Sequence, residues 1–310
     1  MALLDALRAL TSFDPPASLP PCDPGELGDV LDAHGLAPLA SYLLENRPIG
    51  ASVPPELRER LLPLYQGAVN DNVFKVLTLK GALRAVEVPA LVLEAVAYVD
   101  WLYPHLAFRP IGTLRLAVQG TDGERFAREV AAGGFATGAA GPGGHTATFS
   151  DGRLELRLQE GLVEGRADDL GLFERRTPLP VLGACAARPA AEDALLVTVA
   201  DLALAGLHAS LLSYLDLRQL LLLPELAAPA RLAAVRERAA RAGLSRALHG
   251  ACALVAHFFP QVAGTAAALS PALGHAERLA VEAALDSVRD PARLRLLRGV
   301  EAAARRLFAP

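Results

Sequence analysis

Two short segments carry polar side chains whose spacing suits chemistry on the face of a sheet. Polar and apolar residues alternate in the segment that begins at Thr113, so Thr113 and Arg115 share one face of a predicted strand. In the segment that ends at Gln159, Glu155 and Arg157 likewise share a face, opposite three leucines. Carboxylates on such a face can hold a metal ion, and guanidinium groups can bind a phosphate or another anion.

Upstream of the first segment, Arg109 adds a third guanidinium to this region. Arg109, Arg115 and Arg157 therefore form a candidate anion-binding set. The glycine-rich residues 133–144 contain neither the Gly-Lys-Ser/Thr ending of a phosphate loop nor a GxGxxG pattern, and they predict a loop. No GxSxG or HExxH motif is present, and the three cysteines are far apart, which argues against a disulfide framework and a structural zinc site.

The hydrophobic pattern predicts which elements position these residues. A helical segment spans residues 1–86, with helix starts at Asp23 or Asp29 and at the Pro54-Pro55 pair. A mixed α/β core spans residues 87–189, and an all-helical domain spans residues 190–310. Within the core, the predicted elements are a strand at 88–93, a helix at 95–103, a strand at 113–118, a helix from Asp122 to Gly133, and a hairpin at 146–159.

Composition and charge argue against some classes of protein, namely nucleic-acid-binding, secreted and membrane-spanning proteins. The chain has 30 Lys and Arg against 34 Asp and Glu, a net charge of -4, and its basic residues are spread out, so no nucleic-acid partner is expected. The first residues lack the basic start and apolar run of a signal peptide, which favours a cytoplasmic location. Residues 247–276 carry no Asp, Glu, Lys or Arg, but interior His, Pro and Gly indicate two helices and no membrane span.

The same uncharged stretch, residues 247–276, is a candidate binding surface in the C-terminal domain. Some of its apolar side chains can remain exposed for a protein partner or for a second copy of the chain. A buried pair of core helices is the alternative.

A series of short motifs, each weak alone, occurs in a fixed order along residues 25–260. They are His34-Gly35-Leu36-Ala37-Pro38-Leu39, Leu102-Tyr103-Pro104, Arg109-Pro110-Ile111-Gly112-Thr113-Leu114-Arg115-Leu116-Ala117-Val118, Glu155-Leu156-Arg157-Leu158 and Leu215-Asp216-Leu217. In this order they resemble uncharacterised bacterial nucleotidyltransferases of the DNA polymerase β-like superfamily. Those proteins carry Leu-Lys-Gly at the end of a first strand, Arg-Pro-Met-x-Asp-Ile-Asp-Leu-Leu-Val on the next, and Glu-Leu-His-Trp on a later one.

The resemblance implies a site in which an Asp-x-Asp pair and a third acid hold two Mg²⁺ ions against a triphosphate. It also implies a glycine turn that lets the backbone approach the phosphates. The corresponding positions here are Thr113 and Arg115 for the two aspartates, Glu94 and Ala95 for the Lys-Gly, Gly112 before the strand, and Glu155 for the third acid. Only Gly112 and Glu155 match, and an arginine cannot give up its charge to make room for a cation.

The resemblance therefore implies the fold, and the residues argue against the activity. The expected fold class is α+β, a small nucleotidyltransferase-like mixed sheet with flanking helices, extended by N-terminal helices and a C-terminal helical domain. The expected function is that of a catalytically degenerate protein that works as an adaptor or regulatory subunit for a protein partner or as a homo-oligomer, with no cofactor and no metal. Two alternatives are open: an active Mg²⁺-dependent nucleotidyltransferase with unusual ligands, and a metal-independent sensor of a nucleotide or anion.

One contact is predicted at the altered site. Strand alternation places Arg115 and Glu155 on the same side of the sheet, opposite their leucine neighbours. In the family fold the two strands are adjacent. We therefore expect Arg115 and Glu155 to form a salt bridge in the place of the metal ions.

Overall fold

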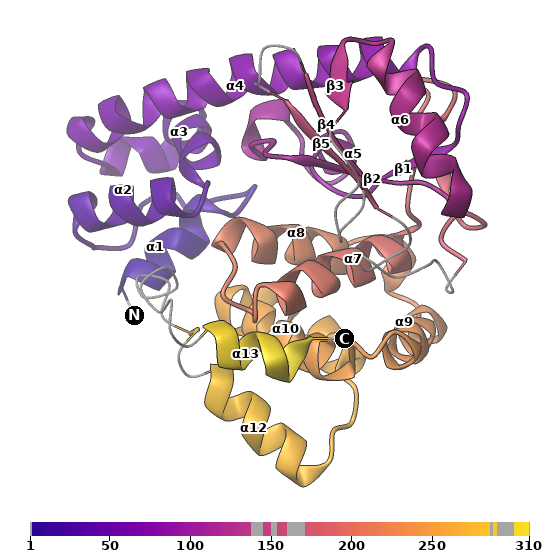
Figure 1. Ribbon diagram of the computed structural model, residues 1–310. Coiled ribbons are helices and arrows are strands. Elements are labelled where there is room, and N and C mark those ends of the chain that lie inside the picture. Colours follow the sequence, from indigo (N-terminus) through magenta and orange to yellow (C-terminus); the bar gives the residue numbers. More distant parts are fainter. Residues whose placement is uncertain are drawn as a thin grey trace. The chain divides into compact units, whose positions relative to one another are not determined.

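The computed structural model describes residues 2–137, 145–149, 154–159, 171–285, 288–289 and 301–309 (Figure 1). The chain divides into two compact units. The first comprises Met1–Val69, Ala107–Pro110 and Thr198–Pro310, and the second comprises Asn70–Leu106 and Ile111–Val197. Two helices, α4 (Pro55–Leu83) and α7 (Ala191–Leu204), run from one unit into the other. The three-segment division by sequence stays a prediction.

The first unit is helical. Its helices, besides parts of α4 and α7, are α1 Ala2–Leu10, α2 Pro24–Ala33, α3 Ala37–Asn46, α8 Leu211–Leu221, α9 Pro229–Arg241, α10 Ser245–Phe258, α11 Ala263–Leu269, α12 His275–Leu285 and α13 Glu301–Phe308. Short 3₁₀ turns cover Pro48–Ser52, Pro224–Leu226 and Pro260–Val262. Helix α2 begins as its sequence predicts, because the Asp23 carboxylate accepts a hydrogen bond from the Glu26 backbone N–H at 2.7 Å.

Helices from the two ends of the chain share one core in this unit. Arg8 of α1 donates to the carbonyl oxygen of Phe258 at 2.9 Å, so a cation sits at the C-terminal end of α10, where the helix dipole favours it. The ring Nδ1 of His34 accepts a hydrogen bond from the backbone N–H of Leu211 at 3.1 Å. Arg218 of α8 donates to the Thr11 carbonyl oxygen at 2.6 Å. The N-terminal helices are therefore tied to α8 by buried polar contacts and to α10 by a part-buried one.

The second unit contains a mixed sheet. Its strands are β1 Ala90–Val92, β2 Leu114–Ala117, β3 Phe135–Thr137, β4 His145–Phe149, β5 Glu155–Gln159, β6 Thr177–Pro178 and β7 Ala186–Arg188, in the order β3-β4-β5-β2-β1-β7-β6. The pairs β2–β5 and β1–β7 are parallel, and the other neighbours are antiparallel. The helices of this unit, besides its parts of α4 and α7, are α5 Val96–Val99 and α6 Gly123–Ala131, with a 3₁₀ turn at Gly120–Asp122. A further 3₁₀ turn, Leu106–Phe108, begins at the last residue of this unit's first segment and continues into the first unit. The expected fold class is confirmed.

Several local predictions are confirmed and two are wrong. The long helix from Pro55 and the β4–β5 hairpin are present as predicted, although the turn at residues 150–152 lies outside the described residues. The helix predicted at residues 95–103 is a single turn, Val96–Val99, because its β-branched and aromatic side chains disfavour a longer helix. The loop predicted at 133–144 contains strand β3, which pairs with β4.

The uncharged residues 247–276 form most of α10 together with α11 and the start of α12. The apolar side chains of α10 are buried, among them Leu248, Leu254 and Phe258. In the part of the chain that the structure describes, no helix is long and apolar enough to cross a bilayer. Along α10, this region is therefore a buried core helix, which was the alternative to a binding surface. Its role as a docking surface stays a prediction.

The three cysteines differ in exposure, which leads to a chemical prediction. Cys185 and Cys252 are buried, and Cys22 is partly exposed. Burial raises the pKa of each thiol, for Cys252 to about 12, so neither buried thiol readily becomes a nucleophilic thiolate. We expect a thiol-specific chromogenic disulfide to modify one cysteine in the native protein and all three after denaturation. Replacing Cys22 with Ser should abolish the native reaction, and a fast reaction in that variant would contradict the packing described.

Candidate functional site

The candidate site lies on the polar face of the central strands of the second unit. Strands β2 and β5 pair in parallel, with Arg115 opposite Arg157 and Leu114 opposite Leu156. Both leucines are fully buried, so the alternation places the polar residues of the two strands together on the other face. The predicted neighbourhood of the two strands and the shared face of Arg115 and Glu155 are therefore confirmed.

The third element of the site is the turn after β1. Strand β1 runs antiparallel to β2, and the N–H of Leu93 donates to the Arg115 carbonyl oxygen at 3.0 Å. Glu94 follows directly, and Ala95 begins the single turn of α5. This turn brings the Glu94 side chain to the same side as Arg115.

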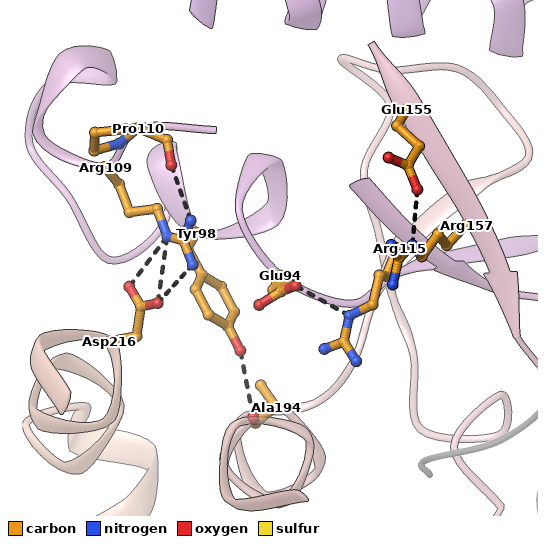
Figure 2. A network of polar contacts seen from close by, with 9 residues as sticks. All are labelled: Glu94, Tyr98, Arg109, Pro110, Arg115, Glu155, Arg157, Ala194 and Asp216. Carbon is orange, nitrogen blue, oxygen red and sulfur yellow. Dashed lines mark hydrogen bonds and ion pairs between the residues drawn. The ribbon is translucent and has the colours of Figure 1, made fainter. Parts of the chain in front are cut away.

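Arg115 pairs with Glu94 and not with Glu155, so the predicted salt bridge is wrong in its partner. The Arg115 Nε donates to Glu94 Oε1 at 3.0 Å, and the two side chains are only 12% and 24% exposed (Figure 2). Glu155 instead accepts from Arg157 Nε at 2.9 Å, with both side chains more than 40% exposed. Glu155 and Arg157 are two residues apart on one strand face, and this local pairing needs no reach across to β2.

Ala95 has an unusual backbone for a residue with a side chain. Its φ is 51° and its ψ is -91°, in a region that glycine adopts easily and L-residues rarely adopt. This is the position at which the resemblance implies a glycine. The turn therefore has a conformation typical of glycine although residue 95 is alanine, and the alanine stores backbone strain of about 1–3 kcal/mol.

Gly112 lies just before β2 in an open position. A Cβ added to Gly112 would meet no heavy atom within 4 Å, and its φ is not in the left-handed region. Within the described structure, no close contact or special backbone angle requires glycine there. Thr113, between Gly112 and the strand, offers a hydroxyl and no charge.

Arg109, the third candidate anion-binding residue, belongs to the first unit, where it holds a buried carboxylate. Its Nη2 donates to Asp216 Oδ2 at 2.8 Å, and its Nε lies 3.3 Å from the same oxygen. The side chains of Arg109 and Asp216 are 10% and 3% exposed, and Figure 2 shows their contact. Asp216 comes from the Leu-Asp-Leu motif on α8, so two of the matched motifs meet in one ion pair. The sequence contained both motifs, but nothing in it indicated their contact.

Two polar residues of α4 hold the chain just before β2, and sequence reasoning missed both. Asn72 donates from Nδ2 to the Leu106 carbonyl oxygen at 2.7 Å and accepts from the Ile111 N–H at 2.9 Å. The Lys75 ammonium donates to the Ile111 carbonyl oxygen. Asn72 and Lys75 are buried, and these contacts set where the strand leading to Arg115 begins. Polar residues spaced by three on a helix were the only available signal.

The donor set on this face does not fit a pair of magnesium ions. Within the described ranges, no three or more His, Cys, Asp and Glu side chains are placed to share an ion. The carboxylates of Glu94 and Glu155 each hold a guanidinium, and Thr113 has only a neutral oxygen. Magnesium prefers several oxygen ligands with at least one free carboxylate, and the permanent charge of Arg115 opposes a second cation.

Comparison with known proteins supports the resemblance noted from the motifs. A family model described as an uncharacterised nucleotidyltransferase matches residues 20–260, more than half of the chain. A search of curated proteins and a search of solved structures each gave no significant match.

The shielded Glu94–Arg115 pair should contribute more to stability than the exposed Glu155–Arg157 pair. We expect Glu94→Ala and Arg115→Ala each to lower the free energy of unfolding by about 1–3 kcal/mol, because each leaves a poorly solvated charge without its partner. A double-mutant cycle should give a coupling of about 1 kcal/mol or more. The matched cycle on Glu155 and Arg157 should give at most about 0.5 kcal/mol. Equal couplings in the two cycles would contradict the assignment.

The strained turn should be relieved by restoring glycine. We expect Ala95→Gly to raise the free energy of unfolding by up to about 1 kcal/mol, because the relief of positive φ outweighs the added freedom of the unfolded chain. The control is Ala97→Gly, at a buried helical position two residues later, which should lower it by about 1 kcal/mol. Thermal or urea unfolding measures both changes. Destabilisation by Ala95→Gly would show that the turn is not strained.

Proposed function

Because the chain belongs to the family of uncharacterised nucleotidyltransferases, we propose that it keeps the family's fold without the family's metal-dependent transfer and acts by binding. In this proposal it serves a protein partner, in the cytoplasm, as an adaptor or regulatory subunit. The observation that carries the proposal is the guanidinium of Arg115, which stands at the second aspartate position and is paired with Glu94.

The electrostatics of this pair support the loss of transfer chemistry. Two-metal catalysis relies on carboxylates that neutralise the ions and place them between the attacking and leaving oxygens. Arg115 puts a fixed positive charge at such a position, partly shielded from water, where repulsion of another cation is stronger than in bulk solvent. The Glu94 carboxylate could compensate, but its oxygen is already engaged by that guanidinium.

The charges at these two positions are reversed relative to the family pattern. The resemblance implies a lysine at position 94 and an aspartate at position 115, and the chain has Glu94 and Arg115. Each replacement alone would leave two like charges facing each other, and together they form an ion pair at 3.0 Å. This matched reversal agrees with the proposal, because the two opposite charges cancel each other and the site needs no metal ion to fold.

A second candidate function is metal-independent binding of an anion, and the exposure of Arg157 favours it. Arg157 is 48% exposed and its partner Glu155 is 41% exposed, and such surface pairs are weak. An incoming phosphate can therefore displace Glu155 at little cost. Arg115 and Arg109 are held by more buried carboxylates, so they are poorer candidates for the same role.

A transfer assay tests the leading proposal. The purified chain is incubated with labelled ATP, GTP, CTP or UTP, with Mg²⁺ or Mn²⁺, alone and with other proteins. We expect no covalent incorporation of nucleotide, because the ions lack their carboxylate ligands. Metal-dependent labelling that Glu155→Ala abolishes would overturn the proposal and favour an active enzyme with unusual ligands.

A metal-binding titration provides the matched control. The triple variant Thr113→Asp, Arg115→Asp, Glu94→Lys restores the family pattern. It should bind Mn²⁺ more tightly than the unchanged chain, as measured by paramagnetic resonance.

Calorimetric titration with nucleotides separates the two binding functions. Trp101 supplies a second readout, because it is the single tryptophan of the chain and lies in the second unit under the Arg188 guanidinium at 3.6 Å. Nucleotide binding that does not depend on Mg²⁺ and is lost in Arg157→Ala would support the anion sensor. The absence of binding with every nucleotide would support the adaptor.

A further inference from the structure

A cavity opens between two helices of the first unit, α9 and α11. Its volume is about 350 Å³. On α9 the lining residues are Pro229, Leu232 and Arg236, whose spacing by three and four places them on one face of the helix. A volume of this size is at the small end of the range for sites that bind small molecules, about 300–1,000 Å³.

Small residues on α11 leave this space open. Gly264, Thr265 and Ala268 form the α11 wall of the cavity. A Cβ added to Gly264 would meet no heavy atom within 4 Å, and the φ of this glycine is not in the left-handed region. The backbone therefore does not require glycine at this position, and the missing side chain adds to the free space of the cavity.

The lining of the cavity is apolar except for two side chains. Leu232, which is buried, provides aliphatic carbon together with Pro229 and Ala268. Thr265 adds a hydroxyl, which makes no hydrogen bond to any residue that the structure describes. Arg236 is the charged residue of the lining. A mostly apolar cavity with a few polar groups is typical of sites that take a small organic ligand.

The guanidinium of Arg236 is held in place but is not neutralised. Its Nη1 donates to the Ala268 carbonyl oxygen in the last turn of α11, where backbone carbonyl groups lack partners within the helix. Among the described residues, no carboxylate forms an ion pair with Arg236. A guanidinium carries five N–H groups, so the remaining ones can bind an anion in the cavity.

From this lining we infer that the cavity binds a small monocarboxylate, with the carboxylate on Arg236 and a short aliphatic chain against Leu232. A carboxylate accepts two parallel hydrogen bonds from the guanidinium fork. One cation in the lining matches one negative charge, which favours a monocarboxylate over a phosphate dianion. The cavity belongs to a different unit from the polar face of β2 and β5, and its ligand is independent of the proposed function.

Titration of the full chain with straight-chain carboxylates, followed by ligand-observed magnetic resonance, tests the site. Hexanoate should bind with a dissociation constant of about 0.1–1 mM. From butanoate to hexanoate, the affinity should rise about fourfold for each added methylene, because each one removes more apolar surface from water. Hexanol lacks the charge and inorganic phosphate lacks the aliphatic chain, so each should bind more weakly than hexanoate by about tenfold or more.

Replacement of Arg236 tests the charged contact. Arg236→Gln keeps a hydrogen-bond donor for the Ala268 carbonyl but removes the charge, and it should weaken hexanoate binding by about tenfold or more. Arg236→Lys keeps the charge without the fork and should lose less affinity. The matched control is Arg246→Gln on α10, because Arg246 forms no ion pair with a described residue and does not line the cavity. This control should leave the dissociation constant unchanged.

Filling the cavity tests its position. Gly264→Leu adds a side chain to the α11 wall and should weaken hexanoate binding by about tenfold or more, without loss of thermal stability, because leucine is the better helix former. The matched control is Gly67→Leu on α4, where an added Cβ also meets no heavy atom within 4 Å and which does not line the cavity. Absence of hexanoate binding at about 10 mM, or binding that either Arg236→Gln or Gly264→Leu leaves unchanged, overturns the proposal.

Discussion

The parallel pairing of β2 with β5 is the constraint on which the candidate site depends. Leu114 and Leu156 are opposite each other and fully buried, so burial of these leucines sets the register of the two strands. A one-residue shift of either strand would turn its own arginine, Arg115 or Arg157, into the core at a large desolvation cost. Because the register cannot slip, the polar residues of both strands must share one face, whatever their chemical types.

Ion pairs then determine which charged groups of the polar face are available to bind a metal ion or an anion. A partly shielded guanidinium needs a carboxylate close by, since an unpaired charge in such a place is costly. Glu94 meets that need for Arg115 on this face, and within the first unit Asp216 meets it for Arg109. Both contacts consume the groups that could otherwise bind a metal ion or an anion. On the described part of this face, the pair of Glu155 and Arg157 is more exposed and is more easily exchanged.

The chain has the mixed sheet and helices expected from its family resemblance, while several residues at the candidate site differ from the family pattern. The backbone after β1 still makes the turn that a glycine would make, although Ala95 adopts it under strain. The framework of strands and the position of that turn are maintained by core packing, which does not involve the polar side chains of the candidate site. Fold and activity can therefore separate, and the family membership supports the first more directly than the second.

The sequence by itself determined the α+β class, the leucine-lined strands, the shared face of Arg115 and Glu155 and the family resemblance, because these follow from periodicity and from ordered motifs. Only the tertiary structure decided the partners of the charged residues. Glu94 lies 21 residues from Arg115, and Asp216 lies 107 residues from Arg109, so no local pattern could reveal either pair. Pairing between distant residues depends on how strands and helices pack in three dimensions, and a linear pattern carries no record of that packing.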